Sequence, residues 1–333
     1  MSTVRQGGQE SQIAAFFQLS SRQDEFRKEH MVQHFIPSLV SILSPVFNEA
    51  KHIVDMMESV LNQTHHEFEL IFVDDGSTDN TEQLIREYSA RDSRIKLISE
   101  GKLGKVAAFN RAYNESRGAV IVLSAGDDLL PPNSLELRIK AVRSAWGRPD
   151  TKVAAFARLK TFSDNPRFSG QVIPRSPSRG SRSGGALALS RTLADLLFPI
   201  PETLVSEDLW LGNGAEAAAE AIVELPDIVL AYRIHEGNSN PRNQPFDSLN
   251  ESIHSRMKAF SLLAAQDRFE LPEAKREHFQ ALWDLERLRF DRDSLAILTK
   301  QGAPFVARLR ALSMSHPKIH GIRTHFFKLL SGW

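Results

Sequence analysis

The chain of 333 residues contains no cysteine at all. This absence excludes a disulfide-held scaffold, a zinc site built on thiolates and a cysteine nucleophile, and it fits a reducing compartment. The chain also lacks an excess of either charge, because 41 Lys and Arg residues balance 41 Asp and Glu residues. A dedicated nucleic-acid-binding protein needs a basic surplus to contact phosphates, so we expect no nucleic-acid partner.

Long apolar runs are missing as well, since none approaches the roughly 18–20 residues that a membrane-spanning helix needs. The first 37 residues carry acids and no apolar signal core, so we expect no secretion and a cytoplasmic location. What the chain does contain is ordinary for a globular protein, with 41% apolar and 25% charged residues. Its length allows about two domains, or one large domain with extensions.

The chain has three regions that differ in amino-acid composition and pattern. Residues 1–36 are polar and rich in Gln and Ser, which predicts an N-terminal extension that is helical. Residues 37–240 alternate short β-branched runs with helical patterns, which predicts the catalytic or binding domain. In residues 241–333 Gly and Pro become sparse from about Phe246, which predicts a helical C-terminal region.

The middle region predicts an α/β fold with a mostly parallel sheet flanked by helices. Four apolar runs recur at intervals of roughly 25 to 30 residues, with helical patterns between them, and this spacing is typical of strand–helix–strand units. The runs are 39–43 (stopped by Pro45), 68–73, 95–98 and 119–123. Asp79 and Glu82 resemble a capping box at the start of one intervening helix. Ligands of such sheets bind beyond the carboxyl ends of the strands.

Acidic pairs follow two of these predicted strands. Asp74 and Asp75 come after the second run, and Asp127 and Asp128 come after the fourth. Neighbouring carboxylates repel at neutral pH, so a divalent cation that bridges to phosphates is a natural partner. For the first pair, a turn through Gly76 with Asp79 as a helix cap remains an alternative.

Several segments in a fixed order resemble glycosyltransferase family two. They are residues 40–49, 59–64, 73–79, 104–110, 126–128, 206–208 and 232–235. The resemblance implies a GT-A fold and an inverting transfer of a sugar from a nucleotide-diphosphate donor to a hydroxyl acceptor. It also implies a divalent metal, Mn²⁺ or Mg²⁺. One departure stands at Ala125, where many members carry the first acid of the metal motif.

The resemblance places the donor nucleotide against the ends of the first two strands. Pro45, Phe47, Glu49 and Asp75 match the positions that hold the base and the ribose. A carboxylate such as Asp75 can accept the imide N–H of uracil or thymine, which favours UDP or dTDP. Phe47 offers a ring face to the base, or packs below the site instead.

The metal and the diphosphate are expected at the second acidic pair. The resemblance assigns Asp127 and Asp128 to the metal, with Asp128 as the more direct ligand, and the ion would stabilise charge on the departing phosphate. His235 follows a predicted strand and would contact the metal or the diphosphate, unless it is structural. Lys105 would add a cation to the same group, or is a solvated surface lysine.

The general base is expected in the segment Ser206–Asp208. We assign this role to Asp208, with Glu207 orienting it or touching the acceptor; the alternative is an exposed carboxylate on the first turn of a helix. The segment 163–185 holds Arg167, Arg175, Arg179 and Arg182, which predicts a basic flap over the site or a solvated insertion without a role.

Three functions compete. The first is a hexosyltransferase acting on a saccharide or lipid-linked acceptor in bacterial surface polysaccharide or glycolipid assembly. The second is a sugar-1-phosphate nucleotidyltransferase, for which residues 44–49 lack the Gly-rich basic signature. The third is an inactive glycosyltransferase-like binding protein, which the presence of Asp127, Asp128 and Asp208 disfavours.

The last forty residues suggest a binding surface rather than a part of the catalytic site. From Ser294 to Trp333 there is no acid, and six Lys or Arg residues alternate with apolar and aromatic groups. This combination suits peripheral binding to an anionic membrane at its inner face. The alternative is packing on the catalytic domain or on another subunit of a homo-oligomer.

Overall fold

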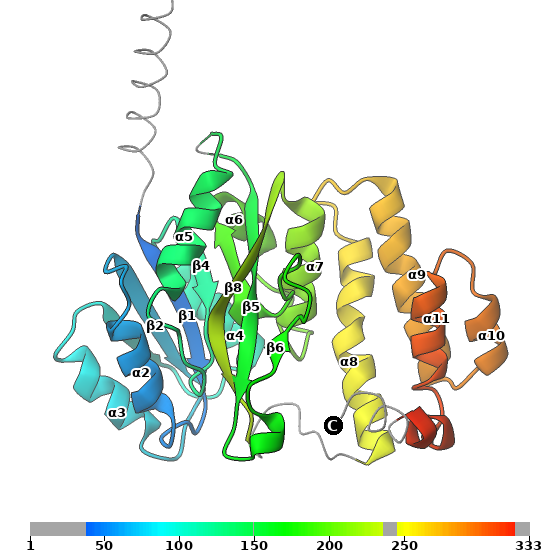
Figure 1. Cartoon of the computed structure of the whole chain (residues 1–333), viewed down its shortest axis with the longest axis horizontal. Helices are drawn as coiled ribbons and strands as arrows, with labels where there is room; N and C mark the ends of the chain where they lie inside the picture. The colour runs from blue at the N-terminus through cyan, green and yellow to red at the C-terminus, as the bar shows by residue number, and fades with distance from the viewer. Residues whose placement is uncertain (1–37, 149, 236–244, 324–333) are drawn as a thin grey trace, which may run out of the picture. The chain divides into compact units, whose positions relative to one another are not determined.

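The computed structural model describes residues 38–148, 150–235 and 245–323, and a mixed sheet lies at its centre (Figure 1). The strands are β1 Val40–Val46, β2 Phe68–Asp74, β3 Ile95–Ser99, β4 Val120–Leu123, β5 Val153–Phe162, β6 Val172–Ile173, β7 Leu187–Ser190 and β8 Ala221–Arg233. The helices are α2 Ile53–Leu61, α3 Thr81–Ser89, α4 Lys105–Asn114, α5 Ser134–Ser144, α6 Arg191–Leu197, α7 Asp208–Ala218, α8 Phe246–Ala264, α9 Glu273–Phe290, α10 Ser294–Thr299 and α11 Phe305–Leu312.

The first four strands form the parallel half of the sheet, as the sequence predicts. They lie in the order β3-β2-β1-β4, and each pair in this half is parallel. Beyond β4 the sheet turns antiparallel through β7 and β5, while β8 runs parallel to β5. The carboxyl ends of β1, β2 and β4 therefore meet at one edge, which is where ligands of such sheets bind.

Two local predictions need correction. Pro45 does not end the first strand, since β1 continues to Val46; its partner β4 pairs with β1 only as far as Leu43, so the missing N–H of Pro45 lies past that ladder. The capping box is also wrong: α3 has Asn80 at its N-cap without a side-chain bond. Asp79 instead accepts hydrogen bonds from the backbone amides of Thr81, at 3.0 Å, and of Ala50, at 3.1 Å.

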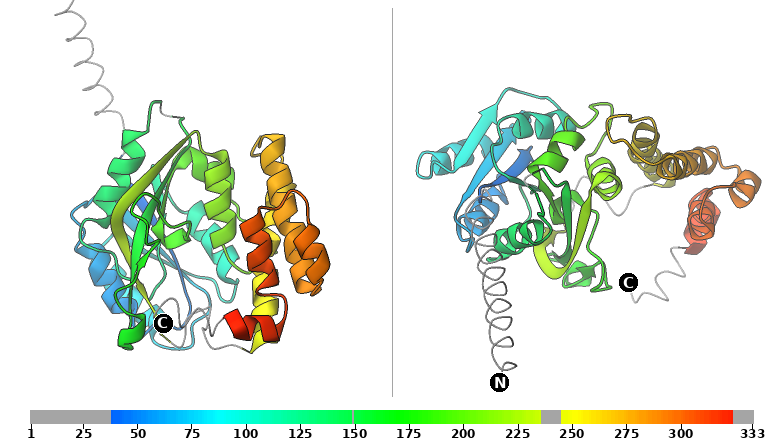
Figure 2. Two further views of the ribbon diagram at one scale, coloured as in Figure 1. Left: turned by 45° about the vertical axis from the view of Figure 1, so that its right-hand side comes forward. Right: turned by 90° about the horizontal axis from the view of Figure 1, so that it is seen from above.

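The sheet separates two apolar cores (Figure 2). Successive residues of β1 face opposite sides, so Leu43 packs into one core and Ile42 into the other. Helices α2, α3 and α5 cover the face of Ile42, while α4, α6 and α7 cover the face of Leu43. Buried apolar side chains on both faces explain why the sequence shows continuous apolar runs rather than alternation.

The C-terminal helices extend the second core. Helix α8 packs beside α7 and buries Ala259, Phe260 and Leu263 in the same cluster as Trp210. Helices α9, α10 and α11 form a smaller cluster around Ile297. In the described part of the chain, every helix is too short or too polar to cross a membrane. The predicted N-terminal extension and residues 324–333 of the basic tail lie outside the described residues, and the predicted domain boundaries stay predictions.

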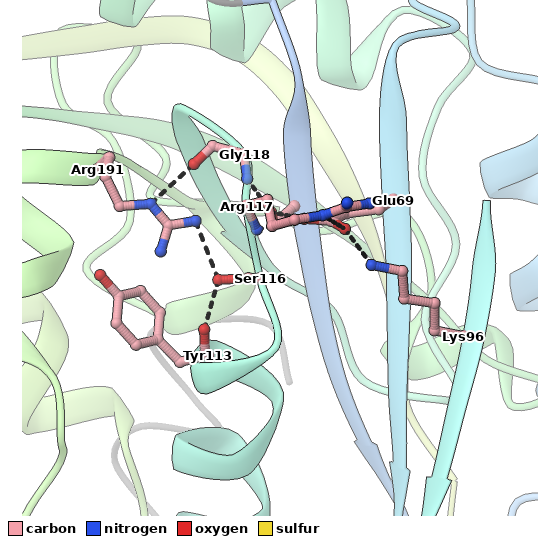
Figure 3. Close-up of polar contacts among 8 residues, drawn as sticks. Glu69, Lys96, Tyr113, Ser116, Arg117, Gly118 and Arg191 are labelled. Carbon is pink, nitrogen blue, oxygen red and sulfur yellow. Dashed lines mark hydrogen bonds and ion pairs between the residues drawn. The ribbon is translucent and has the colours of Figure 1, made fainter.

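A buried polar network ties the strands together at their amino ends, away from the ligand edge (Figure 3). The Glu69 carboxylate is only 3% exposed and accepts hydrogen bonds from Ser41 Oγ at 2.6 Å, the Arg117 amide at 2.6 Å and Lys96 Nζ at 2.7 Å. Arg191 braces the same loop through the Gly118 carbonyl at 2.9 Å. The buried charge is fully partnered, so we interpret this network as structural.

Candidate active site

A cavity of about 410 Å³ opens at the carboxyl edge of the sheet; we call it the strand-end cavity. Every predicted site residue except His235 lines it. The lining includes Pro45, Phe47, Glu49, Asp75, Lys102, Gly104, Lys105, Ser124, Ala125, Gly126, Asp127, Asp128, Ser183, Gly185, Glu207, Asp208 and Tyr232. Residues far apart in the sequence meet here because parallel strands end at one edge.

The acidic pair after β4 is held by the end of β8. The Asp128 carboxylate is 3% exposed and accepts a hydrogen bond from the Arg233 amide at 2.9 Å. The Arg233 guanidinium donates to the Asp127 carbonyl at 2.7 Å and to Asp55 at 3.2 Å. Arg233 stands inside one of the family-like segments, but the sequence pattern alone predicts no role for it. Its contacts show that it positions the acidic pair.

His235 approaches this pair from the side. Its Nε2 lies 2.9 Å from Oδ2 of Asp127, and its ring packs against that of His52 with centroids 4.9 Å apart. His235 therefore lies at the acidic pair but is not among the residues that line the cavity. Its predicted role, contact with the metal or the diphosphate rather than a structural one, stays a prediction.

Acidic side chains crowd this end of the cavity. Burial raises the pKa of Glu49 to about 7, and the charges of Asp127 and Asp79 add to the effect. Burial also raises the pKa of Asp128 well above its usual range, with a further contribution from Asp127. A Cβ at Gly126 would lie 2.9 Å from Val46 Cγ1, so only glycine lets the acidic turn pack so closely.

The donor set fits a hard divalent cation that is shared with a ligand. Mg²⁺ sites in nucleotide-dependent enzymes use one or two carboxylates and complete their shell with phosphate oxygens and water. Across the described ranges, no group of three or more His, Asp and Glu side chains is arranged to hold a metal ion alone. Asp127 and Asp128 would therefore need the diphosphate to complete the shell, and burial together with the charge of Asp127 raises the pKa of Asp128, which a bound cation would oppose.

Asp75 lies on the opposite wall, and its two oxygens differ. Its Oδ1 accepts hydrogen bonds from the amides of Leu103 at 2.6 Å and Gly104 at 2.7 Å. Its Oδ2 lies 2.9 Å from Lys102 Nζ. Burial alone would raise the pKa of Asp75, but these hydrogen bonds outweigh it and hold the pKa below its usual value. Asp75 is therefore a fixed anion that accepts hydrogen bonds.

Lys102 also covers Phe47, with Nζ 3.5 Å from the ring centroid. Phe47 is 45% exposed, so it presents its ring to the cavity and does not pack below it. Asp74, the other member of this acidic pair, accepts hydrogen bonds from Ser77 and makes the turn. Gly76 follows with φ of +80°, a conformation that favours glycine. The turn and the ligand-facing acid are thus neighbouring residues.

The predicted base region lies across the cavity at the start of α7. Glu207 is 5% exposed, and its Oε2 lies 3.0 Å from Lys105 Nζ. Burial and the charge of Asp208 raise the pKa of Glu207, which Lys105 partly offsets. The Asp208 side chain is 28% exposed and accepts a hydrogen bond from the Gly184 amide at 3.0 Å. Asp208 is thus the more accessible member of the pair; it forms a long ion pair with Arg256 at 3.7 Å, whereas Glu207 pairs closely with Lys105.

The arginine-rich segment 163–185 is a structured wall rather than an open flap. Its strand β6 pairs with β5; the short helix Pro166–Phe168 precedes β6, and the short helix Gly184–Ala186 begins at the end of the segment. Arg182 contacts Glu216 at 2.9 Å and Glu224 at 2.7 Å and stacks on Phe156. Of this segment, Ser183 and Gly185 line the cavity, while the side chains of Arg167, Arg175, Arg179 and Arg182 do not.

Parts of the chain are similar in sequence to known glycosyltransferases. Residues 41–187 match the family model "Glycosyl transferase family 2". A 105-residue stretch is 40% identical to chondroitin synthase of Escherichia coli, which covers 32% of this chain and 15% of that protein. The chain spans between 15% and 35% of the length of the first three curated relatives that it matches.

Two solved structures share the fold. TarS of S. aureus in complex with UDP-GlcNAc aligns with a TM-score of 0.57 at 20% identity, over 84% of this chain and 82% of that one. The mannosyltransferase PcManGT of Pyrobaculum calidifontis, in complex with GDP-Man and Mn²⁺, aligns with a TM-score of 0.54 at 19% identity, over 87% and 84%. At these identities the likeness establishes the predicted GT-A fold.

Proposed function

Because residues 41–187 match the model of glycosyltransferase family 2, we propose that the chain transfers a sugar from a nucleotide-diphosphate sugar to a hydroxyl acceptor, with inversion. The observation that carries the proposal is the strand-end cavity. It joins Phe47 and Asp75 on one wall, Asp127 and Asp128 at the strand ends and Asp208 on the other wall. The first wall suits the nucleotide base, the strand ends suit the diphosphate, and the wall with Asp208 suits the attacking hydroxyl.

Asp208 is the general base. It is the accessible carboxylate of its pair, and its position on the first turn of α7 is fixed by the Gly184 amide. As the acceptor oxygen bonds to the anomeric carbon, its proton passes to Asp208, and the bond from that carbon to the diphosphate oxygen breaks with its electron pair. Lys105 and Glu207 form an ion pair beside it, so Glu207 orients the site rather than taking the proton.

The base-binding wall favours uracil or thymine. Oδ1 of Asp75 already accepts two amide hydrogen bonds, so only Oδ2 has a lone pair to spare for a ligand. Uracil and thymine offer one imide N–H between two carbonyls, whereas guanine offers two adjacent N–H donors that need both oxygens. Lys102 beside Oδ2 can donate to a flanking carbonyl. UDP or dTDP sugars are therefore the proposed donors.

Asp127 and Asp128 would hold a divalent cation against the diphosphate, with Asp128 as the more direct ligand and His235 in support. When bound, the cation supplies Lewis-acid stabilisation of the charge on the departing diphosphate. The protein's own share is to fix the two carboxylates through Arg233 and to exclude water by their burial. The absence of an acid at Ala125 leaves one fewer candidate ligand on the cavity wall.

A thermal-shift screen tests this function. UDP, dTDP, GDP and their sugars are added with Mn²⁺ or with EDTA, and a ligand that binds the folded state raises the midpoint by mass action. We expect UDP or dTDP with Mn²⁺ to give the largest shift, and an Asp75→Ala variant to lose it while Glu87→Ala, an exposed acid on α3, keeps it. A shift for GDP alone would contradict the base assignment, and release of pyrophosphate from a nucleoside triphosphate would favour a nucleotidyltransferase instead.

We also propose that the C-terminal helices dock on an anionic membrane surface, where a lipid-linked acceptor would reside. Leu295, Phe305 and Val306 are 74%, 63% and 67% exposed on α10 and α11. Arg308 and Arg310 lie on α11 beside them, and residues 294–333 contain no acid. Apolar groups next to cations suit the interface of anionic lipids, where each nearby Lys or Arg contributes about 1 kcal/mol.

Sedimentation with vesicles of phosphatidylglycerol tests this surface. The wild type should sediment at low salt and be released at high salt, because salt screens surface charges. A Phe305→Ser/Val306→Ser variant should stay in solution, while Ile222→Ser, at another exposed apolar position, should sediment. Equal sedimentation of the three proteins would contradict the proposal, and dissociation of a dimer by the double variant would identify a subunit interface.

A further inference from the structure

A second cavity, which we call the α8 cavity, adjoins the strand-end cavity. It has a volume of about 240 Å³, and its walls come from α4, the loop before α7, α7 and α8. Lys105 and Asp208 line both cavities, so the two spaces meet at the proposed base. Since pockets for drug-sized ligands span roughly 300–1,000 Å³, this one suits a single saccharide ring or a small polyol.

Three serine hydroxyls give the α8 cavity its polar surface. Ser206 precedes α7, while Ser252 and Ser255 lie on α8. The Ser206 hydroxyl is buried and has no hydrogen-bond partner. A buried hydroxyl without a partner costs free energy that a bound ligand can recover. Hydroxyls that both donate and accept are well suited to the hydroxyls of a sugar or a polyol.

Arg256 gives the same cavity a cation with donors to spare. Its Nε is buried without a hydrogen-bond partner, and its Nη2 forms a long ion pair with Asp208 Oδ2 at 3.7 Å, which is beyond hydrogen-bond distance. Lys105, the other cation of the lining, already contacts Glu207. Helix α8 is anchored one turn further on by the buried Ala259 and Phe260, so the backbone that carries Arg256 is fixed.

We propose that the α8 cavity is the acceptor subsite, and that Arg256 selects acceptors with an anionic group, a phosphate or a carboxylate, next to the attacking hydroxyl. A guanidinium binds either group through paired, charge-assisted hydrogen bonds. With the anion on Arg256 and the ring against the serines, a neighbouring hydroxyl would face Asp208. The attack of that hydroxyl on the donor sugar rests on the proposed function, but binding of the anionic group can be measured without sugar transfer.

Binding of matched probes to the full chain tests this assignment. Saturation-transfer NMR compares methyl glucuronide with methyl glucoside, and glycerol phosphate with glycerol. We expect the anionic member of at least one pair to bind about tenfold more tightly or better. The pair that shows the difference distinguishes a carboxylate from a phosphate. In Arg256→Gln the difference should disappear, whereas Lys258→Gln, an exposed cation on the same helix, should keep it.

A second variant tests the cavity without changing Arg256, in case Arg256→Gln impairs folding. Ser255→Leu fills the cavity without changing its charge, and it should also lose the anionic probe. Equal binding of charged and neutral probes, no binding of either anionic probe, or a preference that survives Arg256→Gln would each overturn the proposal. Titration of the same samples with UDP tests the donor site separately from the acceptor subsite, because Arg256 does not line the strand-end cavity. UDP binding should be unchanged in Arg256→Gln, and its failure in the wild type would contradict the proposed function alone.

Discussion

Replacing Lys105 by Met should destabilise the protein in a way that depends on pH. Glu207 is buried, and Lys105 is its ion-pair partner at 3.0 Å. Breaking a fully buried pair costs about 3–5 kcal/mol. The Lys105 side chain is 42% exposed, so water already screens part of the interaction, and we expect about 1–3 kcal/mol at pH 8. This loss is a sizeable share of a typical stability of about 5–15 kcal/mol.

The sign of the pH dependence follows from Glu207. Burial raises its folded-state pKa above the usual 4.5, and removal of Lys105 raises it further. Below pH 4.5 the carboxyl is protonated in both folded and unfolded states, so the variant should lose little there. The loss should grow as pH rises from about 4.5 through the raised pKa, because the folded state must then bury an unpaired charge.

Urea denaturation between pH 4.5 and pH 8 measures this effect. Lys105→Met/Glu207→Gln is the matched control, because it removes the charge that Lys105 neutralises and should recover most of the stability at pH 8. A loss that is equal at both ends of the pH range, or a double variant no more stable than the single one, would refute the assigned pairing.

Two further changes probe the chemistry and the frame. Asp208→Asn should lower sugar transfer by ~10²-fold or more while UDP affinity stays constant, since the amide keeps the shape of the side chain but not its basicity. Calorimetry with UDP measures the affinity, and a transfer assay measures the rate. Near-normal transfer would place the base elsewhere. Glu69→Gln should cost about 2–4 kcal/mol, because the charge is lost and the NH₂ group that replaces Oε2 is a donor facing the Lys96 ammonium. Burial would raise the pKa of Glu69, but the hydrogen bonds outweigh it and lower the pKa. The free energy of unfolding of the wild type should therefore fall as pH falls through that pKa. Urea denaturation of the variant should not show this pH dependence.

The sequence was sufficient wherever local pattern and edge geometry decide the outcome. The β-branched runs predicted β1 to β4, because strands buried on both faces need continuous apolar side chains. The rule that parallel strands end at one edge brought Asp75 and Asp128 into one cavity. The family-like segments gave the expected donor class, which local pattern alone does not contain.

What the sequence did not reveal depends on contacts between distant segments. Lys102 stands in a loop without a distinctive pattern, and only the fold brings it onto Phe47 and Asp75. Arg256 reads as one cation on an amphipathic helix until the packing of α8 places it beside Asp208. The segment 163–185 looked like an open flap, since its pairing with β5 and the ion pairs of Arg182 are invisible in its composition.

Calorimetric titration of UDP in the presence of Mn²⁺ tests the central claim most directly. The wild type should bind UDP, EDTA should weaken that binding, and Asp128→Ala should abolish the effect of the metal, because the remaining Asp127 cannot hold a divalent ion against a diphosphate. Glu87→Ala, an exposed acid on α3 outside the cavity lining, is the matched control and should bind as the wild type does. No heat from any nucleoside diphosphate, or equal affinity with and without metal in both proteins, would contradict the account.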